Sequence, residues 1–450
     1  MDIKDLYDKF RTCSGVTTDS RAVKGGEMFF ALRGENFDGN DYALKALRAG
    51  ASYAVCDRED VPSPEKDPWR LIRTADSLAT LQALARYHRE NSFVGGSRLK
   101  VVGLTGTNGK TTTKELVTRV LSARYNVTST PGNLNNDIGV PLSLLGIGPR
   151  TELAVIEMGA SHPDDIEKLV KVCEPDYGLI TNVGKAHLLG FGSFEGVKHA
   201  KGCLYDWILS HGGRLFLNLD DPVLVEMVRE RGIPDEMVVG YGISHSGSIV
   251  LPSDAAHPYL RMAVPQEEGS DTLTGIETHL AGAYNANNVA AAIAVGLHFG
   301  VPLDDAVQAI EGYVPTNNRS QMEDTGRNTL IVDAYNANPT SMAAALDNLA
   351  LVQAPLKAAF LGDMRELGAD SLAEHETILG KVRSMGLGLV CLVGEEFGKA
   401  LRDVPGEGIE KWFPTSADLA SWLEGNPVEG MTILVKGSRG IQMETVLPKL

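Results

Sequence analysis

At 450 residues the chain is longer than one hydrophobic core usually organises, so we expect roughly two to four domains, with three fitting best. Its formal net charge of −16 argues against binding to nucleic acid or to an anionic membrane surface, because no basic patch offsets that charge. The five cysteines are odd in number and lack C-x-x-C spacing, which is typical of reduced thiols rather than of a disulfide framework or a zinc site. The N-terminus lacks the features of a secretion signal and no apolar run is long enough for membrane insertion, so we expect a cytoplasmic protein.

Residues 1–97 have the pattern of a small α/β domain. Short apolar strands are expected within residues 26–32 and 51–57, on either side of a helix that Gly50 ends. A further helix begins near Ser77, and residues 91–98 are expected to form a linker to the next domain.

Residues 98–312 alternate apolar strands with amphipathic helices. Four strands with the continuous apolar character of a parallel sheet buried on both faces are expected within residues 100–106, 153–159, 177–184 and 213–220. This pattern predicts a central P-loop-type nucleotide-binding domain, with a less regular β-rich edge at 245–280.

Residues 313–450 repeat the alternation and predict a third, Rossmann-like domain. Its strands are expected within residues 328–335, 357–364, 388–396 and 431–440. The fold class is therefore α/β, in three domains.

The stretch "VVGLTGTNGKTTTKELV", residues 101–117, runs from a strand through a glycine-rich turn into a helix. Backbone N–H groups at such a turn have no internal partners, Lys110 supplies a positive charge, and Thr111 supplies a hydroxyl for Mg²⁺. The G-x-x-x-x-G-K-[ST] pattern is not met, because Leu104 stands five residues before Gly109, so the loop is a variant phosphate cradle. An ordinary strand-to-helix connection is the alternative.

Polar residues recur where the predicted strands end, which in parallel sheets is the edge at which ligands collect. Glu157 is the best candidate for a second Mg²⁺ contact, while a structural role stays open for His187, Asn182 and Asp363. We expect these strand ends to converge on one site: Glu157, Asn182, His187, Asp333, Asp363, Lys436 and Arg439.

Several motifs in this order resemble the Mur ligase superfamily: "GTNGKTTTKE", "NVGKAHLLGFGSFEGV", "YNANNVAAA", "DAYNANP", "LGDMRELG" and "VKGSRG". The resemblance covers nearly the whole chain, including the first domain through "TTDSRAVKGGEMFFALRGENFDGNDY". It implies an ADP-forming ligase that makes an amide bond through an acyl phosphate in peptidoglycan synthesis, and so serves cell-wall biogenesis, cell shape and cell division.

Within the superfamily, "GNLNNDIGVPLSLL" and "YNANP" favour the addition of D-alanyl-D-alanine to a UDP-N-acetylmuramoyl tripeptide. The alternatives are another amide ligase, either the tripeptide-forming enzyme or one like folylpolyglutamate synthase, and a nucleotide-binding regulatory protein without chemistry. The resemblance further implies ATP and Mg²⁺ as cofactors, a UDP-sugar-binding first domain, small-molecule partners and a monomer.

The resemblance also assigns roles to individual residues. Catalysis falls to Lys110, His187 and Lys201, the last being a lysine that the superfamily often carbamylates, although a solvated helix lysine is the alternative. Metal ligands are Thr111, Glu157 and His187. Nucleotide contacts in the glycine-rich loop are Thr107, Asn108, Gly109, Lys110, Thr111 and Thr112. The other nucleotide contacts are Asn285 and Asn288 on the adenine side, Arg319 on the phosphate side and Asp333 on the ribose. Substrate contacts are Ser20, Arg21, Asn133, Asn135, Asn136 and Asp137. The chain departs from the family at Tyr284, where relatives often carry histidine, and at Leu189, where many carry an acidic residue.

Overall fold

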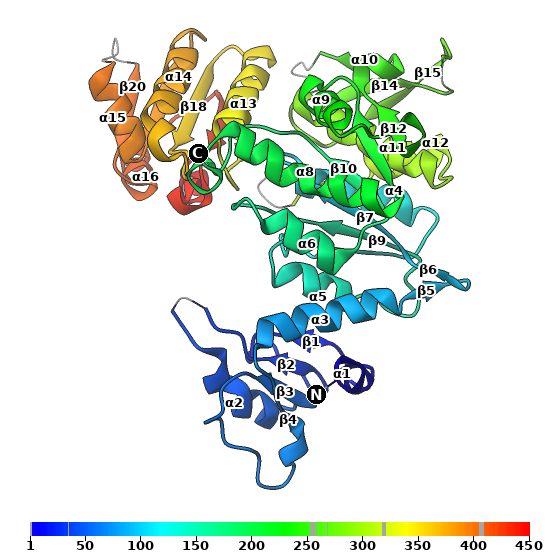
Figure 1. Cartoon of the computed structure of the whole chain (residues 1–450). Coiled ribbons are helices and arrows are strands. Elements are labelled where there is room, and N and C mark those ends of the chain that lie inside the picture. Colours follow the sequence, from blue (N-terminus) through cyan, green and yellow to red (C-terminus); the bar gives the residue numbers. More distant parts are fainter. Residues whose placement is uncertain are drawn as a thin grey trace.

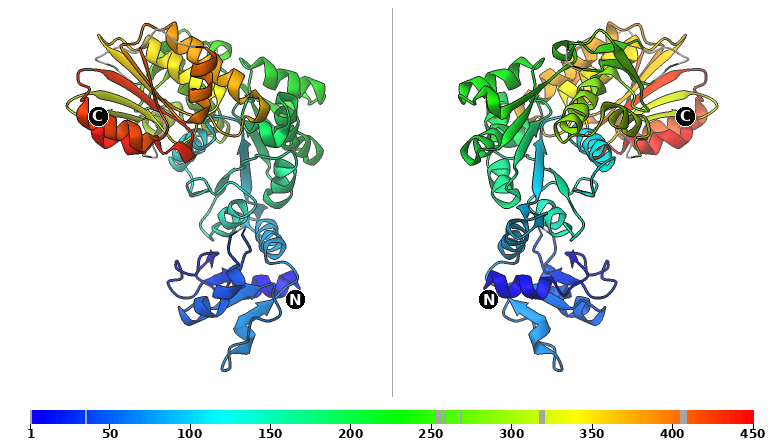
Figure 2. Two further views of the ribbon diagram at one scale, coloured as in Figure 1. Left: turned by 90° about the vertical axis from the view of Figure 1, so that its left-hand side faces the viewer. Right: turned by 90° about the vertical axis from the view of Figure 1, so that its right-hand side faces the viewer.

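The computed structural model describes residues 2–34, 36–252, 257, 259–267, 269–316, 321–404 and 409–450. Three α/β units follow one another along the chain (Figure 1). The first unit lies apart from the third, and the central unit contacts both (Figure 2). In the part of the chain that is described, no helix is long and apolar enough to cross a membrane.

The first unit contains a parallel sheet of four strands in the order β1-β2-β3-β4. The strands are β1 (Val16–Thr17), β2 (Met28–Phe30), β3 (Tyr53–Cys56) and β4 (Leu71–Arg73). The α-helices are α1 (Ile3–Phe10), α2 (Ala43–Arg48) and α3 (Ser77–Glu90), with 3₁₀ turns η1 (Gly39–Tyr42) and η2 (Pro68–Arg70). The strands and helices expected in this unit are confirmed.

The expected linker at residues 91–98 is instead a short antiparallel hairpin of β5 (Phe93–Val94) and β6 (Ser97–Arg98). Gly95 and Gly96 both adopt positive φ, which lets the chain reverse between the two strands. The hairpin lies between α3 and β7, so the segment still connects the two units, and the sequence did not indicate its strands because a glycine pair suits both a hairpin and an irregular linker.

Helix α3 ties the first unit to the central one. Arg89, near its end, is fully buried and donates hydrogen bonds to the carbonyl oxygen of Leu99 at 2.8 Å and to the Asp176 carboxylate at 2.7 Å. A single hydrophobic cluster contains residues of both units, among them Leu84 of α3 and Leu144 of the central unit. These two units therefore share a core rather than meeting through a thin tether.

The central unit is built on a parallel sheet in the order β12-β11-β10-β7-β9-β8. Its strands are β7 (Lys100–Thr105), β8 (Val127–Ser129), β9 (Leu153–Glu157), β10 (Tyr177–Ile180), β11 (Arg214–Asn218) and β12 (Val238–Tyr241). An antiparallel sheet of β13 (Ile249–Leu251), β14 (Arg261–Pro265) and β15 (Leu273–Glu277) confirms the β-rich edge.

Helices cover both faces of the central sheet (Figure 1). They are α4 (Lys110–Ser122), α5 (Gly139–Leu145), α6 (Asp165–Cys173), α7 (Leu188–Phe191), α8 (Phe194–His211), α9 (Pro222–Glu230), α10 (Ile243–Ser246), α11 (Ala286–His298) and α12 (Leu303–Glu311), with 3₁₀ turns η3 (Asp235–Met237) and η4 (Ala283–Asn285). Leu116, Val117, Val120 and Leu121 of α4 are completely buried, so the apolar stripe behind the phosphate loop is confirmed.

The third unit has a sheet in the order β16-β17-β21-β18-β19-β20, which is parallel except at β16. The strands are β16 (Gln321–Asp324), β17 (Thr329–Asp333), β18 (Lys357–Gly362), β19 (Leu389–Val393), β20 (Glu410–Phe413) and β21 (Thr432–Lys436). The helices are α13 (Pro339–Leu351), α14 (Ser371–Arg383), α15 (Glu395–Asp403) and α16 (Ser416–Gly425), with 3₁₀ turns η5 (Gly368–Asp370), η6 (Arg439–Ile441) and η7 (Met443–Lys449).

Candidate active site

A cavity of about 770 Å³ lies where the carboxyl ends of strands from the central and third units meet. Most of the residues predicted from the sequence line it: Thr107, Asn108, Gly109, Lys110, Thr111, Thr112, Asn133, Asn135, Asn136, Asp137, Glu157, His187, Asn285, Asn288 and Asp333. Ser20, Arg21 and Lys201 do not line the cavity, and Arg319 lies outside the described residues. The structure thus brings together residues separated by more than 200 positions.

The loop between β7 and α4 is held in place by the end of β10. Asn182 accepts a hydrogen bond from the backbone N–H of Thr107 at 3.0 Å through its carbonyl, and one from Asn108 at 3.0 Å through its side chain. Gly106 approaches Thr181 so closely that an added Cβ would lie 1.9 Å from the Thr181 hydroxyl. Asn182 therefore shapes the loop, and Gly106 leaves no room for a Cβ unless the Thr181 side chain moves.

Lys110 begins α4 directly after Gly109, whose positive φ of 76° turns the chain into the helix. The Lys110 ammonium donates to the carbonyl oxygens of Gly106 at 2.9 Å and Thr107 at 3.1 Å. This bent conformation holds the Lys110 charge over the loop, beside the backbone N–H groups of the first turn of α4.

Glu157, at the end of β9, presents a free carboxylate oxygen at the bottom of the cavity. Its Oε1 accepts hydrogen bonds from Asn135 at 2.7 Å and from Thr111 at 3.2 Å. Its Oε2 accepts no hydrogen bond within the described residues and has only Lys114 at 3.9 Å, although the side chain is 1% exposed. A buried carboxylate oxygen without a hydrogen-bond donor, next to a threonine hydroxyl, fits a divalent cation.

His187 lies across the cavity, and its Nδ1 contacts the carboxylate of Glu366 from the third unit. Burial lowers the pKa of His187 from its ordinary value, with the nearby Glu366 carboxylate acting in the opposite direction. Among the described residues, no group of three or more His, Cys, Asp and Glu side chains could by itself hold a metal ion. Any ion here would rely on hydroxyl, phosphate or water oxygens as well.

Lys201 lies behind the phosphate loop and is 3% exposed. Its amine donates to the carbonyl oxygen of Gly106 at 2.8 Å. Burial lowers the pKa of Lys201 well below its ordinary value, and the neighbouring charge of Lys110 lowers it further. The alternative of a solvated helix lysine is therefore wrong.

Asn285 and Asn288 are buried, and their amides bond to each other and to the protein. Asn288 donates to Asn285 at 2.9 Å and accepts from the Thr113 hydroxyl at 3.1 Å, while Asn285 donates to the carbonyl of Ala281 at 2.8 Å. This chain of bonds fixes α11 against α4 at the wall of the cavity.

In the third unit, Asp333 pairs with the buried ammonium of Lys436, which also donates to the carbonyl of Asn336 at 3.0 Å. Sequence reasoning missed Asn338 of the same loop. Its amide exchanges two hydrogen bonds with the amide of Asn108 in the phosphate loop, at 2.8 and 3.4 Å. The "YNANP" motif was the available signal, but it did not indicate which side chain reaches the other domain.

Two of the predicted strand-end residues, Asp363 and Arg439, do not line the cavity. Asp363 instead accepts hydrogen bonds at 2.9 Å from the backbone N–H groups of Glu396 and Phe397, at the start of α15. Arg439 lies over the ring of Tyr335, 5.6 Å from its centroid. For Asp363 the prediction failed because a neighbouring helix start satisfied the carboxylate.

The loop after Asp363 is fixed by a buried histidine, His375, which predicts a pH effect on stability. His375 is fully buried, its Nε2 accepts from the N–H of Met364 at 3.0 Å, and its Nδ1 lies 2.7 Å from the carbonyl of Ser371, so the ring is neutral. Burial lowers the pKa of His375 in the folded chain. The unfolded ring has a pKa near about 6.5, so stability present at pH 7.5 is lost as the pH falls below that value.

We therefore expect the urea midpoint of unfolding to fall between pH 7.5 and pH 5.5. H375Q should be less stable at pH 7.5 but should lose less on acidification, because glutamine takes up no proton. Other buried histidines such as His88 act in the same direction, so the comparison of the two chains isolates His375. Equal acid-induced decreases in the two chains would contradict this assignment.

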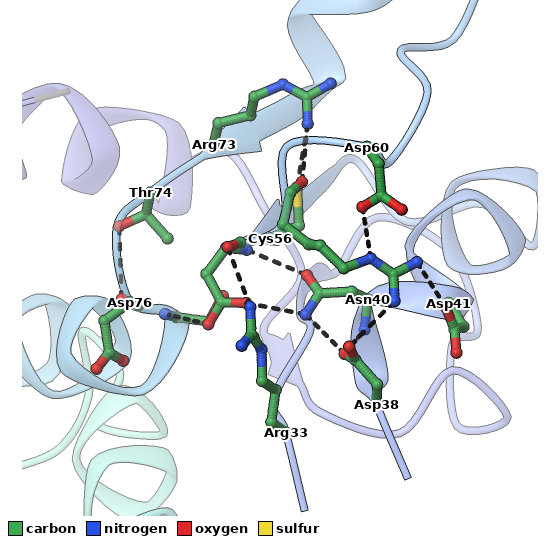
Figure 3. Close-up of polar contacts among 12 residues, drawn as sticks. Arg33, Asp38, Asn40, Asp41, Cys56, Asp60, Arg73, Thr74 and Asp76 are labelled. Atoms are coloured by element: carbon green, nitrogen blue, oxygen red, sulfur yellow. Dashed lines mark hydrogen bonds and ion pairs between the residues drawn. The ribbon is translucent and has the colours of Figure 1, made fainter.

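Ser20 and Arg21 lie in the first unit, away from the cavity. Arg21 is exposed and pairs with Asp19 at 2.8 Å, and its hydrogen bonds lower the pKa of Asp19 to about 2. In the same unit, the buried Asn40 donates to Asp38 at 2.7 Å and to Asp57 at 2.9 Å (Figure 3). This network holds the loop between β2 and η1 against the carboxyl end of β3.

Comparisons with known proteins agree along the whole chain. The Mur ligase family, catalytic domain, matches residues 12–89, the Mur ligase middle domain matches residues 104–296, and the Mur ligase, glutamate ligase domain, matches residues 318–439. A UDP-N-acetylmuramoyl-tripeptide–D-alanyl-D-alanine ligase of Bacillus subtilis strain 168 is 33% identical over 448 residues, covering 97% of this chain and 93% of that protein. The chain belongs to the Mur ligase family.

Solved structures place this Mur ligase beside MurF proteins. A MurF from Acinetobacter baumannii superimposes with a TM-score of 0.84 at 29% identity, covering 100% of this chain and 98% of that one. A MurF ligase from Thermotoga maritima in complex with ADP has a TM-score of 0.80 at 27% identity, with 100% and 98% covered. The predicted three-domain α/β Mur ligase architecture is confirmed.

Proposed function

We propose that this Mur ligase joins D-alanyl-D-alanine to a UDP-N-acetylmuramoyl tripeptide, converting ATP to ADP and phosphate, as a step of peptidoglycan precursor synthesis. The full-length relatives named for this reaction support the choice, as does the relative solved with ADP. The observation that carries the proposal is the cavity in which a phosphate loop, a buried carboxylate and the third unit's strand ends meet. Such precursor synthesis takes place in the cytoplasm, which is our proposed location.

The chemistry requires two displacements. The terminal carboxylate of the tripeptide attacks the γ-phosphorus of ATP, so that ADP leaves and an acyl phosphate forms. The amine of D-alanyl-D-alanine then attacks the acyl carbon, loses a proton and expels phosphate through a tetrahedral intermediate. The first step brings several negative charges together, and Lys110 over the loop is placed to neutralise part of that charge.

Mg²⁺ fits the residues present. Thr111 and the free oxygen of Glu157 would hold one ion, and His187 a second. When bound with nucleotide phosphates, Mg²⁺ supplies charge neutralisation during phosphoryl transfer. The chain's own contribution is to fix Glu157 through Asn135 and Thr111, so that one carboxylate oxygen remains available.

We also propose that Lys201 is carbamylated. Burial lowers the pKa of the Lys201 amine and so favours its neutral form, and only the neutral amine has the lone pair that bonds to the carbon of CO₂, with loss of a proton to give an anionic carbamate. The change would convert a site of unfavourable positive charge into an anion near the proposed metal ligands.

The remaining roles are proposals for this chain. Asn285 and Asn288 would face the adenine, Asp333 the ribose, and Arg319 the phosphates. The UDP part of the substrate would bind Ser20 and Arg21 of domain 1–97. The peptide would contact Asn133, Asn135, Asn136 and Asp137 of domain 98–312. Domain 313–450 would close over the nucleotide, and the protein would act as a monomer. For this closure we propose a hinge at residues 312–320, "GYVPTNNRS", where Gly and Pro follow the preceding helix. Residues 317–320 of this segment lie outside the described part of the chain.

Phosphate release with matched substrates tests the function. With ATP and a UDP-N-acetylmuramoyl tripeptide, D-alanyl-D-alanine should stimulate release and appear in the product, while free glutamate and single amino acids should not. Stimulation by glutamate or diamino acids instead would indicate one of the alternative ligases. ATP hydrolysis that no substrate mixture accelerates would indicate a regulatory nucleotide-binding protein.

A further inference from the structure

We propose that Glu366 of the third unit is a positioning residue that holds His187 of the central unit in its working orientation. The proposal rests on the role of His187 given under the proposed function, and assigns a role to Glu366, the second acidic residue of the "LGDMRELG" motif. It places the support of a central-unit side chain on the third unit.

Glu366 contacts the segment of His187 through both its side chain and its backbone. The Glu366 carboxylate contacts Nδ1 of His187, and the Glu366 carbonyl oxygen accepts a hydrogen bond at 3.1 Å from the N–H of Leu189. With Nδ1 engaged, only Nε2 of the ring remains available to a ligand in the cavity. A carboxylate behind a histidine is the usual means of fixing the ring's tautomer and direction.

The segment that carries His187 has no carboxylate of its own to do this. The segment around His187, residues 184–192, reads "GKAHLLGFG" and contains no acidic residue. At Leu189, two residues after His187, the chain has an apolar side chain that is 71% exposed. The support must therefore come from outside the segment, and Glu366 is the group that reaches it.

Both backbones are held in a conformation that is unfavourable for these residue types. His187 has φ of 52° and Glu366 has φ of 65°, in the left-handed region that side chains other than glycine rarely adopt. Such conformations persist only where the surroundings impose them, and they concentrate at functional sites. The paired strain indicates that this contact has a specific geometry rather than being a chance meeting of two surface loops.

The loop that carries Glu366 is itself rigid. The N–H of Met364 bonds to His375 at 3.0 Å, and the N–H of Arg365 bonds to the hydroxyl of Ser438 at 2.9 Å. Glu366 is thus presented from a fixed loop, as a positioning group must be.

A neighbouring ion pair provides a matched control. Lys185 of the central unit pairs with Glu374 of α14 at 2.6 Å, so it crosses the same interface without touching His187. If Glu366 merely helped to dock the two units, E366A and E374A would have similar effects. If Glu366 acts through His187, only E366A will impair turnover.

The test measures kcat and KM for the full chain with ATP, UDP-tripeptide and D-alanyl-D-alanine. We expect E366A to lower kcat about 10- to 100-fold with little change in KM, the scale found for groups that support a ligating histidine. E366Q, which keeps a hydrogen-bond acceptor, should recover part of the loss. E374A should stay within about twofold of wild type, since Lys185, which loses its partner, is about half exposed and can be solvated.

A double-mutant comparison asks whether Glu366 acts through His187. H187A and H187A/E366A should have the same kcat, because the second change removes support from a ring that is already absent. Independently of activity, the histidine ¹⁵N signal that disappears in H187A should shift in E366A and not in E374A. Solution scattering of E366A and E374A should match wild type.

Three outcomes would overturn the inference. One is an equal loss of kcat in E366A and E374A together with a larger radius of gyration in both, which would mean that Glu366 only helps to dock the two units. Another is wild-type kcat in E366A alongside an inactive H187A. The third is near wild-type kcat in H187A, which would also remove the proposed role of His187, while continued formation of the D-alanyl-D-alanine adduct would leave the ligase assignment standing.

Discussion

Replacing Lys110 with alanine is expected to lower turnover by at least about a hundredfold, the scale of losing one electrostatic stabiliser of a transition state. The carboxylate and the γ-phosphoryl group are both anionic, so the approach of one to the other needs a positive charge in a fixed position. The ammonium of Lys110 has that position, because two loop carbonyl oxygens, those of Gly106 and Thr107, hold it at 2.9 and 3.1 Å.

The fold should survive the substitution. Lys110 lines the cavity, so water can reach the Thr107 carbonyl that loses its donor, and the Gly106 carbonyl keeps the hydrogen bond from Lys201. The apolar stripe of α4 begins at Leu116, beyond the first turn that Lys110 opens. R119A removes an exposed cation from the last turn of the same helix and provides the control. Steady-state phosphate release, with circular dichroism melting of both variants, would check the expectation; K110A activity within a few-fold of R119A would remove the loop from the mechanism.

The sequence was sufficient for the architecture because its sheets are parallel and buried. Strands covered on both faces must be apolar throughout, and the runs ending in Glu157 and Asp333 are therefore visible without any structure. The same logic located the cavity, since ligands collect at the carboxyl ends of such strands. The same reasoning does not show which strand-end residue accepts hydrogen bonds from the start of a neighbouring helix, so the prediction for Asp363 failed.

Contacts between domains could not be predicted in the same way. Asn338 reaches Asn108, and Glu366 reaches His187, across about 230 and 179 positions of sequence. No periodicity links such residues, because their distance is set by how two separately folded sheets dock. The motifs marked both segments as unusual, but only the packed structure assigns partners to them.

Burial of a charged side chain is equally hidden in the sequence. Lys198 and Lys201 are one helical turn apart on α8, and hydrophobic patterning treats them alike. In the structure both lysines are buried, but Lys198 pairs with the partly exposed Glu226 at 3.0 Å, whereas Lys201 points behind the phosphate loop with no carboxylate partner among the described residues. This difference, invisible in the composition, underlies the second large effect that we expect.

Replacing Lys201 with alanine should abolish most activity, and short carboxylic acids such as acetate or formate should partly restore it. If the working form is a carbamate, the variant lacks an anion near the proposed metal ligands and has an empty space where the side chain lay, into which a small carboxylate can fit. K198A is the matched control, since it removes a lysine from the same helix that binds only surface glutamates, and it should keep nearly full activity in the absence of added acid.

The interpretation depends on the sign of the charge that rescues activity. Acetate should help K201A, whereas methylamine, which would restore a cation of similar size, should not. Intact-protein mass measured at neutral pH in bicarbonate should show an added mass of CO₂ on wild type that is absent from K201A and present on K198A. Rescue by the amine would mean that the unmodified amine works as it stands, by donating to the carbonyl of Gly106 and so holding the phosphate loop in shape. Full activity of K201A together with an unmodified lysine in wild type would remove Lys201 from the mechanism.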